Sequence, residues 1–339
     1  MGDKPNLVVI GGGTGSFVIL SGLKQRGYNL TALVNMVDDG GSTGQLRDEY
    51  GVLPPGDVRQ CLVALSDASL SLRELFDFRF PGKSKLGGHS FGNLFLSSVE
   101  MMTNNFLEAI KLASKVLDIH GSVVPVTIEK CQLVMRIGDN EIIGERAVDN
   151  LYIKKGEKHH LFLRPEANII PEAKQAIADA DLIVIAPGNL YCSILPALIV
   201  GGMSDALKSS KAPIVFISNL VNKPSSTFNF SVTDYVEAIE DVIGSGSLDY
   251  VLYNIDIPSK ELLKKYAKEK EFPVKVDEKK LQQASYKAIA GRFLSREVGN
   301  QDKNDTLLKR TLIRHDGKEI ESVIGEILKK RTYHNNIVA

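Results

Sequence analysis

The sequence feature that most constrains the fold is an early glycine-rich turn between two apolar runs. The first run, residues 7–10, leads into four glycines within five positions: Gly11, Gly12, Gly13 and Gly15. A helix-like segment over residues 17–25 and a second apolar run over residues 30–37 follow. Strand, glycine turn, helix and strand in this order are typical of a parallel α/β sheet.

This turn is a candidate site for a phosphate or a diphosphate. Glycine lets the backbone approach a ligand closely and adopt a positive φ without steric cost. Amide groups that open a helix point at an anion, and the helix dipole favours negative charge there. The predicted contact residues are Gly12, Gly13, Thr14 and Gly15. A tight turn without a ligand is the alternative interpretation.

Two familiar nucleotide-binding motifs are incomplete or missing. A G-x-G-x-x-G fingerprint would need a glycine at the position of Ser16, and Asn35 stands nearest the place of the acid that would hold a ribose. A dinucleotide-binding oxidoreductase therefore remains only a second alternative. The G-x-x-x-x-G-K-S/T motif of P-loop NTPases does not occur in the sequence.

A carboxylate-rich segment follows the second apolar run. Asp38 and Asp39 lead into a second glycine-rich loop, and Asp57 follows a Pro-Pro-Gly turn. Asp57 occupies the position expected for a helix N-cap, and it could also face the same cleft as the other two acids. Because Mg²⁺ prefers carboxylate oxygens, Asp39 and Asp57 are candidate metal ligands. Arg47 and Arg59 are the nearest cations, and each could pair with a phosphate or with one of these carboxylates.

Two later segments place polar side chains beside glycines. Residues 86–94 carry a histidine, a serine and an asparagine among three glycines, just before an apolar helix. A buried strand over residues 181–186 ends in a Pro-Gly turn. Because ligands bind at the carboxyl ends of parallel strands, we expect both strand–turn units to line one cleft. The alternative for His89 is a structural role, and the alternative for Arg314 is a surface role. The further candidate ligand-binding residues are Asp38, Asp39, Ser42, Asp57, His89, Ser90, Asn93, Gly188, Asn189, Ser193, Asn219 and Arg314.

The whole pattern predicts an α/β fold, a Rossmann-like and mostly parallel sheet flanked by helices. Four short strand-like runs indicate a small antiparallel β insertion over about residues 121–165; they cover residues 123–128, 132–137, 141–147 and 160–163. Residues 250–254 form the last clear strand, and a helix-rich C-terminal extension covers about residues 259–339. No linker interrupts the chain, so we expect a single domain over residues 1–339.

Composition excludes several classes of partner and location. The chain has 339 residues, with 41 Lys and Arg against 41 Asp and Glu. This balance gives no electrostatic footprint for non-specific nucleic-acid binding, so no nucleic-acid partner is expected. The cysteines Cys61, Cys131 and Cys192 form neither a disulfide framework nor metal-ligand spacing, as suits a reducing cytosol. Neither a signal peptide nor a bilayer-spanning apolar stretch is present, so we expect a cytoplasmic protein.

Several ordered motifs resemble those of one known family. They read GGGTG, VDDGGSTGQLRDEYGVLPPGDVRQCL, GHSFGNLFL and APGNLYCSILP, with RHD at residues 314–316. On these motifs the chain is similar to the YvcK/CofD-like proteins, and specifically to the YvcK or gluconeogenesis factor branch. The resemblance covers most of residues 7–240.

The resemblance implies a Rossmann-like fold and a function in nucleotide binding. Proteins of the YvcK branch bind UDP-sugars, notably UDP-N-acetylglucosamine, and link carbon metabolism to cell envelope synthesis and cell shape without an established catalytic activity. The related 2-phospho-L-lactate transferases use Mg²⁺ to move phospho-lactate from a guanosine diphosphate-linked donor to a deazaflavin. A UDP-sugar-binding regulator is therefore our main expectation, and a Mg²⁺-dependent transferase is the alternative. Whether the protein is an enzyme stays open, no catalytic residue is assigned, and a homodimer is an allowed assembly.

Overall fold

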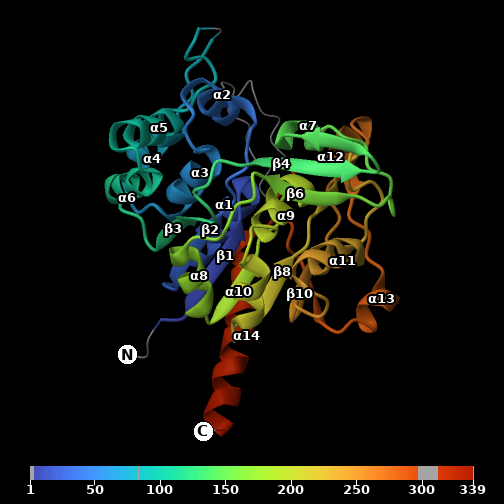
Figure 1. Ribbon diagram of the computed structural model, residues 1–339. Helices are drawn as coiled ribbons and strands as arrows, with labels where there is room; N and C mark the ends of the chain where they lie inside the picture. Colours follow the sequence, from blue (N-terminus) through green and yellow to red (C-terminus); the bar gives the residue numbers. More distant parts are fainter. Residues whose placement is uncertain (1–3, 83, 297–311, 339) are drawn as a thin grey trace.

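The computed structural model describes residues 4–82, 84–296 and 312–338, with side chains up to Arg331 in the last helix. A seven-stranded parallel sheet forms the centre of these residues (Figure 1). Its spatial order is β12 (Lys287–Gly291), β10 (Tyr250–Asn254), β8 (Ile214–Ile217), β7 (Leu182–Ile185), β1 (Asn6–Gly11), β2 (Asn29–Val34) and β3 (Ser122–Pro125). The chain winds in one direction from β1 to β2 and in the other from β7 onward, as in doubly wound folds. The α/β fold class predicted from the sequence is confirmed.

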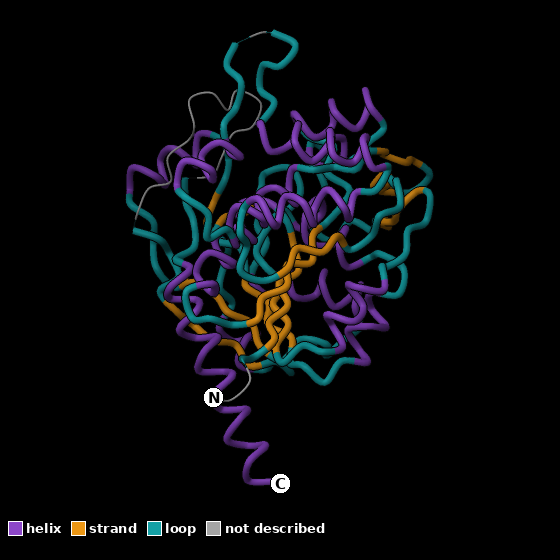
Figure 2. The backbone as a smooth tube through the Cα atoms, turned by 90° about the vertical axis from the view of Figure 1, so that its left-hand side faces the viewer, coloured by secondary structure: helices purple, strands orange, loops and turns teal. Residues whose placement is uncertain are grey.

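Helices cover both faces of the sheet because alternate side chains of each strand point to opposite sides. On β1, Leu7 and Val9 join one hydrophobic core, whereas Val8 and Ile10 join the other. Figure 2 shows the strands as a central layer between helices. Helices of the first face are α1 (Gly13–Lys24), α3 (Gly56–Leu65), α4 (Leu70–Asp77), α5 (Phe91–Thr103), α6 (Phe106–Val116) and α14 (Gly317–Val338).

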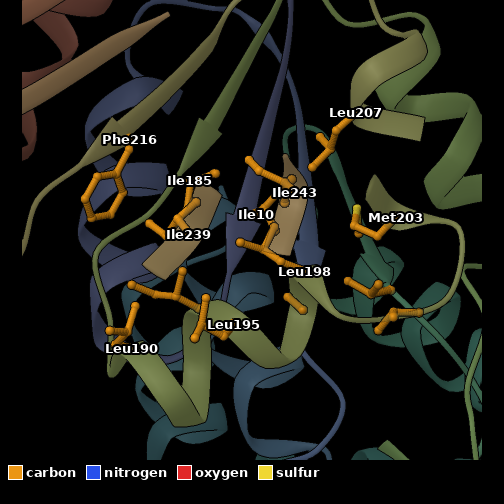
Figure 3. Close-up of a cluster of buried hydrophobic side chains, with 14 of the residues drawn as sticks. Ile10, Ile185, Leu190, Leu195, Leu198, Met203, Leu207, Phe216, Ile239 and Ile243 are labelled. Atoms are coloured by element: carbon orange, nitrogen blue, oxygen red, sulfur yellow. The ribbon is translucent and has the colours of Figure 1, made fainter. Parts of the chain in front are cut away.

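The second face carries a core built from short, wholly apolar strands. Every residue of β7 and of β8 is buried, as expected for parallel strands that are covered on both sides. Figure 3 shows Ile10 and Ile185 of the sheet among leucine and isoleucine side chains of the covering helices. These elements are α8 (Pro171–Ala178), the π-helix η1 (Leu190–Ile194), α9 (Leu195–Leu198), α10 (Met203–Ser209) and α11 (Val232–Ile243).

The predicted insertion contains a separate three-stranded antiparallel sheet. Its strand order is β5 (Asn140–Ile143), β4 (Gln132–Ile137) and β6 (His160–Arg164). Figure 1 shows β4 and β6 above the main sheet. Two expectations for this region were wrong. The run at 123–128 contributes β3 to the main sheet, where it pairs in parallel with β2. The run at 141–147 does not continue as a strand, because Gly144 (φ 100°) ends it and α7 (Glu145–Asp149) begins.

The C-terminal region also differs from the expectation that residues 250–254 form the last strand. β12 pairs in parallel with β10 along five residues and becomes the edge of the main sheet. Its sequence, Lys-Ala-Ile-Ala-Gly, is only weakly apolar, so it lacks the signature of a buried strand. Smaller elements of this half are β9 (Val221–Asn222), β11 (Phe272–Pro273), α12 (Lys260–Lys268) and α13 (Glu278–Gln282). In the described part of the chain, no helix has the length and apolarity needed to cross a membrane.

Helices α1 and α14 cross at two glycines, Gly22 and Gly317. A Cβ atom on Gly22 would lie 2.3 Å from the Gly317 carbonyl oxygen, so no side chain fits there. We expect Gly22→Ala to lower the free energy of unfolding by about 2 kcal/mol, because backbone atoms must move apart. Denaturant unfolding followed by circular dichroism measures this loss. Ser322→Ala, on the exposed side of α14, is the control; an equal loss there would contradict the crossing argument.

Candidate functional site

The two glycine turns predicted to share a cleft are in backbone contact. Helix α1 begins at Gly13, earlier than the predicted start at residue 17, so the predicted cradle forms its first turn. Gly13 has φ +65°, a conformation that favours glycine. A Cβ atom on Gly15 would lie 1.8 Å from the carbonyl oxygen of Pro187, at the end of β7. The first turn of α1 therefore lies directly against the Pro-Gly turn, at the point where the winding of the sheet reverses.

The side chain of Asp57 covers the first of these turns. The expectation that Asp57 is an N-cap was wrong: α3 begins at Gly56, after Pro55, and Asp57 lies in its first turn. Its carboxylate accepts a hydrogen bond from the Gly13 N–H. A Cβ atom on Gly12 would lie 2.0 Å from Asp57 Oδ2, so the acid needs a glycine at that position. Asp57 thus faces the glycine turn, as the alternative expectation for this residue proposed.

Asp57 belongs to a cluster of carboxylates at the carboxyl ends of β1 and β2. Burial, with the nearby Asp38, raises the pKa of Asp57 to about 8. Burial also raises the pKa of Asp38, although the Gly40 N–H donates to its carboxylate at 2.9 Å. Burial, together with Asp38 and other acids, raises the pKa of Glu145 to about 9. At neutral pH the cluster therefore holds protons, because burial disfavours the charged carboxylates and the acids repel one another.

Asp39 faces the insertion. Its carboxylate accepts a hydrogen bond of 2.7 Å from the Arg146 N–H at the start of α7, and Arg47 lies 3.8 Å away. Arg47 also forms an ion pair with Asp48 at 2.7 Å, so of its two predicted roles it has that of pairing with carboxylates. The acid caps α7 and complements the positive end of its dipole. Asp39 thereby fixes the insertion over the carboxyl ends of the strands, where Figure 1 shows α7 near α2 (Gly41–Tyr50).

A buried polar network connects α2 with the histidine segment. The Ser42 hydroxyl lies 2.9 Å from His89 Nδ1, and the side-chain amide nitrogen of Asn93 donates to the Ser42 hydroxyl oxygen at 3.1 Å. Ser90 caps α5, because its hydroxyl accepts from the Asn93 N–H. Burial lowers the pKa of His89, so its imidazole is neutral at pH 7. Arg59 is 1 % exposed and bonds Asn93 and Asp77, which removes it from the candidates for a direct phosphate contact.

The turn after β7 is held by α7 and by β8. Asn189 donates to Asp149 of α7, and Lys223 also pairs with Asp149. The Asn219 amide nitrogen donates to the Gly188 carbonyl at 2.6 Å. Ser193 lies under this turn, with its Cβ 3.1 Å from a Cβ built on Gly188. The residues predicted around the second turn therefore lie together at one edge of the sheet.

The RHD segment reaches the same edge through β8. His315 Nε2 lies 3.0 Å from the Ser218 carbonyl oxygen, one residue before Asn219. Burial lowers the pKa of His315 to about 4, so the neutral ring donates from Nε2. Arg314 lies next to this anchor, and its carbonyl accepts from the Ser295 N–H at 2.9 Å. The segment is thus positioned by main-chain contacts beside Asn219.

Several residues of this site were missed by sequence reasoning. Glu145, Asp149 and Lys223 come from the insertion and from β9 onward, and no local motif marks them. Two buried oxygens at the edge have no hydrogen-bond partner among the described residues: Ser16 Oγ and Asn219 Oδ1. Since buried polar atoms are normally paired, these oxygens are further candidate ligand contacts. Ser16 was considered in the sequence only as a missing glycine.

Metal-ligand groups and cavities are the alternatives to the glycine edge as locations for a site. Within residues 4–82, 84–296 and 312–338, no three His, Cys, Asp or Glu side chains form a group arranged to hold a metal ion. A cavity of about 1190 Å³ lies between β6 and α11, but none of the predicted site residues lines it. Its charges include the internal pair of Lys155 and Asp234 at 2.6 Å. The glycine edge is the better candidate, because helix-opening amides and polar side chains from four strands converge there.

Comparisons with known proteins agree with this architecture. A family model described as 2-phospho-L-lactate transferase CofD matches residues 7–294. The gluconeogenesis factor of Bacillus subtilis is 36 % identical, covering 97 % of this chain and 100 % of that protein. The gluconeogenesis factor of Halalkalibacterium halodurans is 39 % identical, covering 95 % of this chain and 96 % of that protein.

A solved structure extends the likeness to three dimensions. The crystal structure of a UPF0052 family member from Bacillus halodurans has a TM-score of 0.86 and 38 % identity, covering 96 % of this chain and 99 % of that chain. Sequence and structure agree over nearly the whole chain, well beyond the four motifs. The chain therefore belongs to the CofD-like family, in its gluconeogenesis factor (YvcK, UPF0052) branch.

Proposed function

We propose that the protein binds a UDP-sugar, UDP-N-acetylglucosamine in particular, at the edge where the β1 and β7 turns meet. It acts in the cytoplasm as a regulatory protein that links carbon metabolism to envelope synthesis and cell shape. The observation that carries the proposal is the backbone contact between Gly15 and Pro187. This contact places the amides opening α1 beside a second polar turn at the reversal point of the sheet, which is where doubly wound folds bind nucleotides.

The polar groups around this edge match the parts of such a ligand. Amides of residues 12–15 suit the diphosphate, and Gly13 has φ +65° there. On binding, a phosphate oxygen would take the place of Asp57 as the acceptor of the Gly13 N–H. Asn219 Oδ1 and Ser16 Oγ, which are buried without a described partner, suit hydroxyl or amide donors of a nucleoside or sugar. Arg314 precedes His315, whose ring contacts the Ser218 carbonyl, and would supply a cation for phosphate.

A diphosphate beside this many carboxylates requires a cation, and Mg²⁺ suits the donors present. Mg²⁺ is usually held by one or two carboxylates together with phosphate oxygens and waters. Asp57 and Asp38 provide such a pair next to the Gly13 amide, whereas Asp39 is engaged in capping α7. We therefore place the ion at Asp38 and Asp57 rather than at Asp39. When bound, it would neutralise the diphosphate and the carboxylates together.

Isothermal titration calorimetry of the purified protein tests the proposal. We expect saturable binding of UDP-N-acetylglucosamine, with an affinity at least about 10-fold higher in Mg²⁺ than in EDTA, because the ion shields like charges. Asp57→Asn should reduce this Mg²⁺ effect. GDP serves as the comparison ligand that tests recognition of the base, and UMP as the one that tests recognition of the second phosphate. Absence of binding to all three compounds in Mg²⁺ would sink the proposal, and equal affinity in EDTA would remove the ion from it.

The transferase alternative is favoured by one observation, the carboxylate cluster beside the glycine turn, and by the name of the matching family model. Incubation with the guanosine diphosphate-linked phospho-lactate donor, a deazaflavin acceptor and Mg²⁺ separates the two functions. Chromatographic detection of a phospho-lactyl deazaflavin, with release of GMP from the donor, would replace the regulator by an enzyme. Unchanged acceptor, together with measurable UDP-sugar binding, supports the regulator.

A further inference from the structure

A chain of four buried side chains runs from Arg59 to His89. Arg59 Nε donates to Asn93 Oδ1 at 3.0 Å, Asn93 Nδ2 donates to Ser42 Oγ at 3.1 Å, and Ser42 Oγ lies 2.9 Å from His89 Nδ1. The exposed fractions are 1 % for Arg59, 2 % for Asn93, 4 % for Ser42 and 5 % for His89. The four residues come from three segments of the sequence, because His89 and Asn93 both lie at the start of α5, so only the fold assembles the chain.

The direction of this chain is determined at its Arg59 end. A guanidinium group can only donate hydrogen bonds, so the Asn93 atom that faces it must be the carbonyl oxygen. The amide nitrogen of Asn93 therefore faces Ser42 and donates to its oxygen. The Ser42 hydroxyl therefore donates its own hydrogen to another acceptor. Among the described residues, His89 Nδ1 is the acceptor within reach.

On this basis, we propose that Arg59 is a positioning residue that holds His89 as the neutral Nε2–H tautomer. His89 Nε2 then presents a hydrogen-bond donor, and no residue in the described ranges is hydrogen-bonded to it. A ring with this tautomer recognises an oxygen acceptor, such as a phosphate oxygen or an amide carbonyl oxygen. The inference rests on the proposed function, to which it adds a specificity rule: His89 selects ligands that accept a hydrogen bond at this point.

Burial supports the neutral ring. It is the largest cause that lowers the pKa of His89; Glu49 opposes it by raising the pKa, and the cation Arg79 adds a smaller lowering effect. Thr43, next to Ser42, is hydrogen-bonded to Asp38, so the Ser42 member of the chain lies beside the carboxylate cluster. Gly92 also fits the scheme, because a Cβ atom there would lie 2.7 Å from Arg59 Cδ and displace the guanidinium.

Long-range ¹H–¹⁵N correlation spectra of the full chain test the assignment, because the two histidine tautomers have distinct ring-nitrogen signals. The His89 signals are assigned by their loss in His89→Gln. We expect the Nε2–H tautomer in the wild-type protein. Asn93→Asp should reverse the chain: a carboxylate accepts from Ser42 and cannot donate, so Ser42 accepts from His89 Nδ1–H. Ser97→Ala, a buried position one turn along α5 with an unpartnered hydroxyl, is the matched control and should leave the tautomer unchanged.

Calorimetry with UDP-N-acetylglucosamine gives the second readout. Asn93→Asp should bind the nucleotide at least about 10-fold more weakly. Either His89 Nε2 would face the ligand oxygen with a lone pair, or the added carboxylate would repel the ligand. A wild-type Nδ1–H tautomer, or an Nε2–H tautomer that persists in Asn93→Asp, would overturn the inference whatever the affinity. An Nε2–H tautomer in a protein that binds no nucleotide would leave the chain from Arg59 standing and would count against the proposed ligand instead.

Discussion

A Gly13→Val variant is expected to lose about 100-fold in affinity for UDP-N-acetylglucosamine, equivalent to ~2.7 kcal/mol, while remaining folded. Gly13 has φ +65°, a conformation that β-branched residues avoid. Valine should push the turn toward negative φ and rotate the Gly13 N–H away from the position where it now meets Asp57. Calorimetry measures the affinity, and thermal unfolding followed by circular dichroism confirms the fold.

Gly51 offers a matched control for this variant. It has the same φ of +65° at the end of α2, and a Cβ atom there would meet nothing within 4 Å. Gly51→Val should therefore carry a similar backbone cost, about 1–2 kcal/mol of stability, without touching the turn. If Gly51→Val weakened binding as much as Gly13→Val, the loss would reflect general destabilisation, and the cradle would lose its support.

Asp57→Asn is expected to stabilise the metal-free protein at pH 9 by about 5 kcal/mol, and to have little effect near pH 4. Folding raises the pKa of Asp57 to about 8 from an unfolded value near ~4. A carboxyl group with a raised pKa costs stability as the pH rises from its unfolded value to its folded value, because the native state resists ionisation. Asparagine retains the shape and the oxygen that accepts from Gly13, and it removes this charge.

Urea unfolding at a series of pH values measures the effect. Glu145→Gln should behave in the same direction, because folding raises the pKa of Glu145 to about 9. Asp67→Asn is the control of opposite sign: Lys24 lowers the pKa of Asp67, so its replacement should not stabilise the protein at pH 9. Equal stability of wild type and Asp57→Asn across this range would mean that folding does not raise the pKa of Asp57.

The elements predicted with success are those whose signal is local. Residues 7–10 and 181–186 read as buried strands because continuous apolar runs bounded by glycine or proline have few other interpretations. The meeting of the Gly12–Gly15 and Gly188 turns followed from the same reasoning, since parallel strands end at one edge. Helix α2 was expected only as a glycine loop, because two glycines, a serine and a threonine give little helix propensity within residues 41–44.

Residues missed or misplaced at the site are those whose role depends on distant partners. Arg59 stands near the acidic loop in the sequence, yet the fold buries it against Asn93 and Asp77. Asp149 and Lys223 are 74 positions apart and meet only because the insertion closes over the β7 turn. Periodicity cannot show such contacts, because they are fixed by the path of the whole chain.

The amino-acid sequence by itself determined the strand–turn–helix units around β1 and β7, the position of the glycine turns and the family motifs, because each depends on residues close together in the chain. Only the tertiary structure decided which carboxylates crowd together, which cation stays buried and which way the Arg59–His89 chain points. The physical reason is that burial and charge–charge distance set pKa values and hydrogen-bond direction, and both quantities exist only after distant segments have packed.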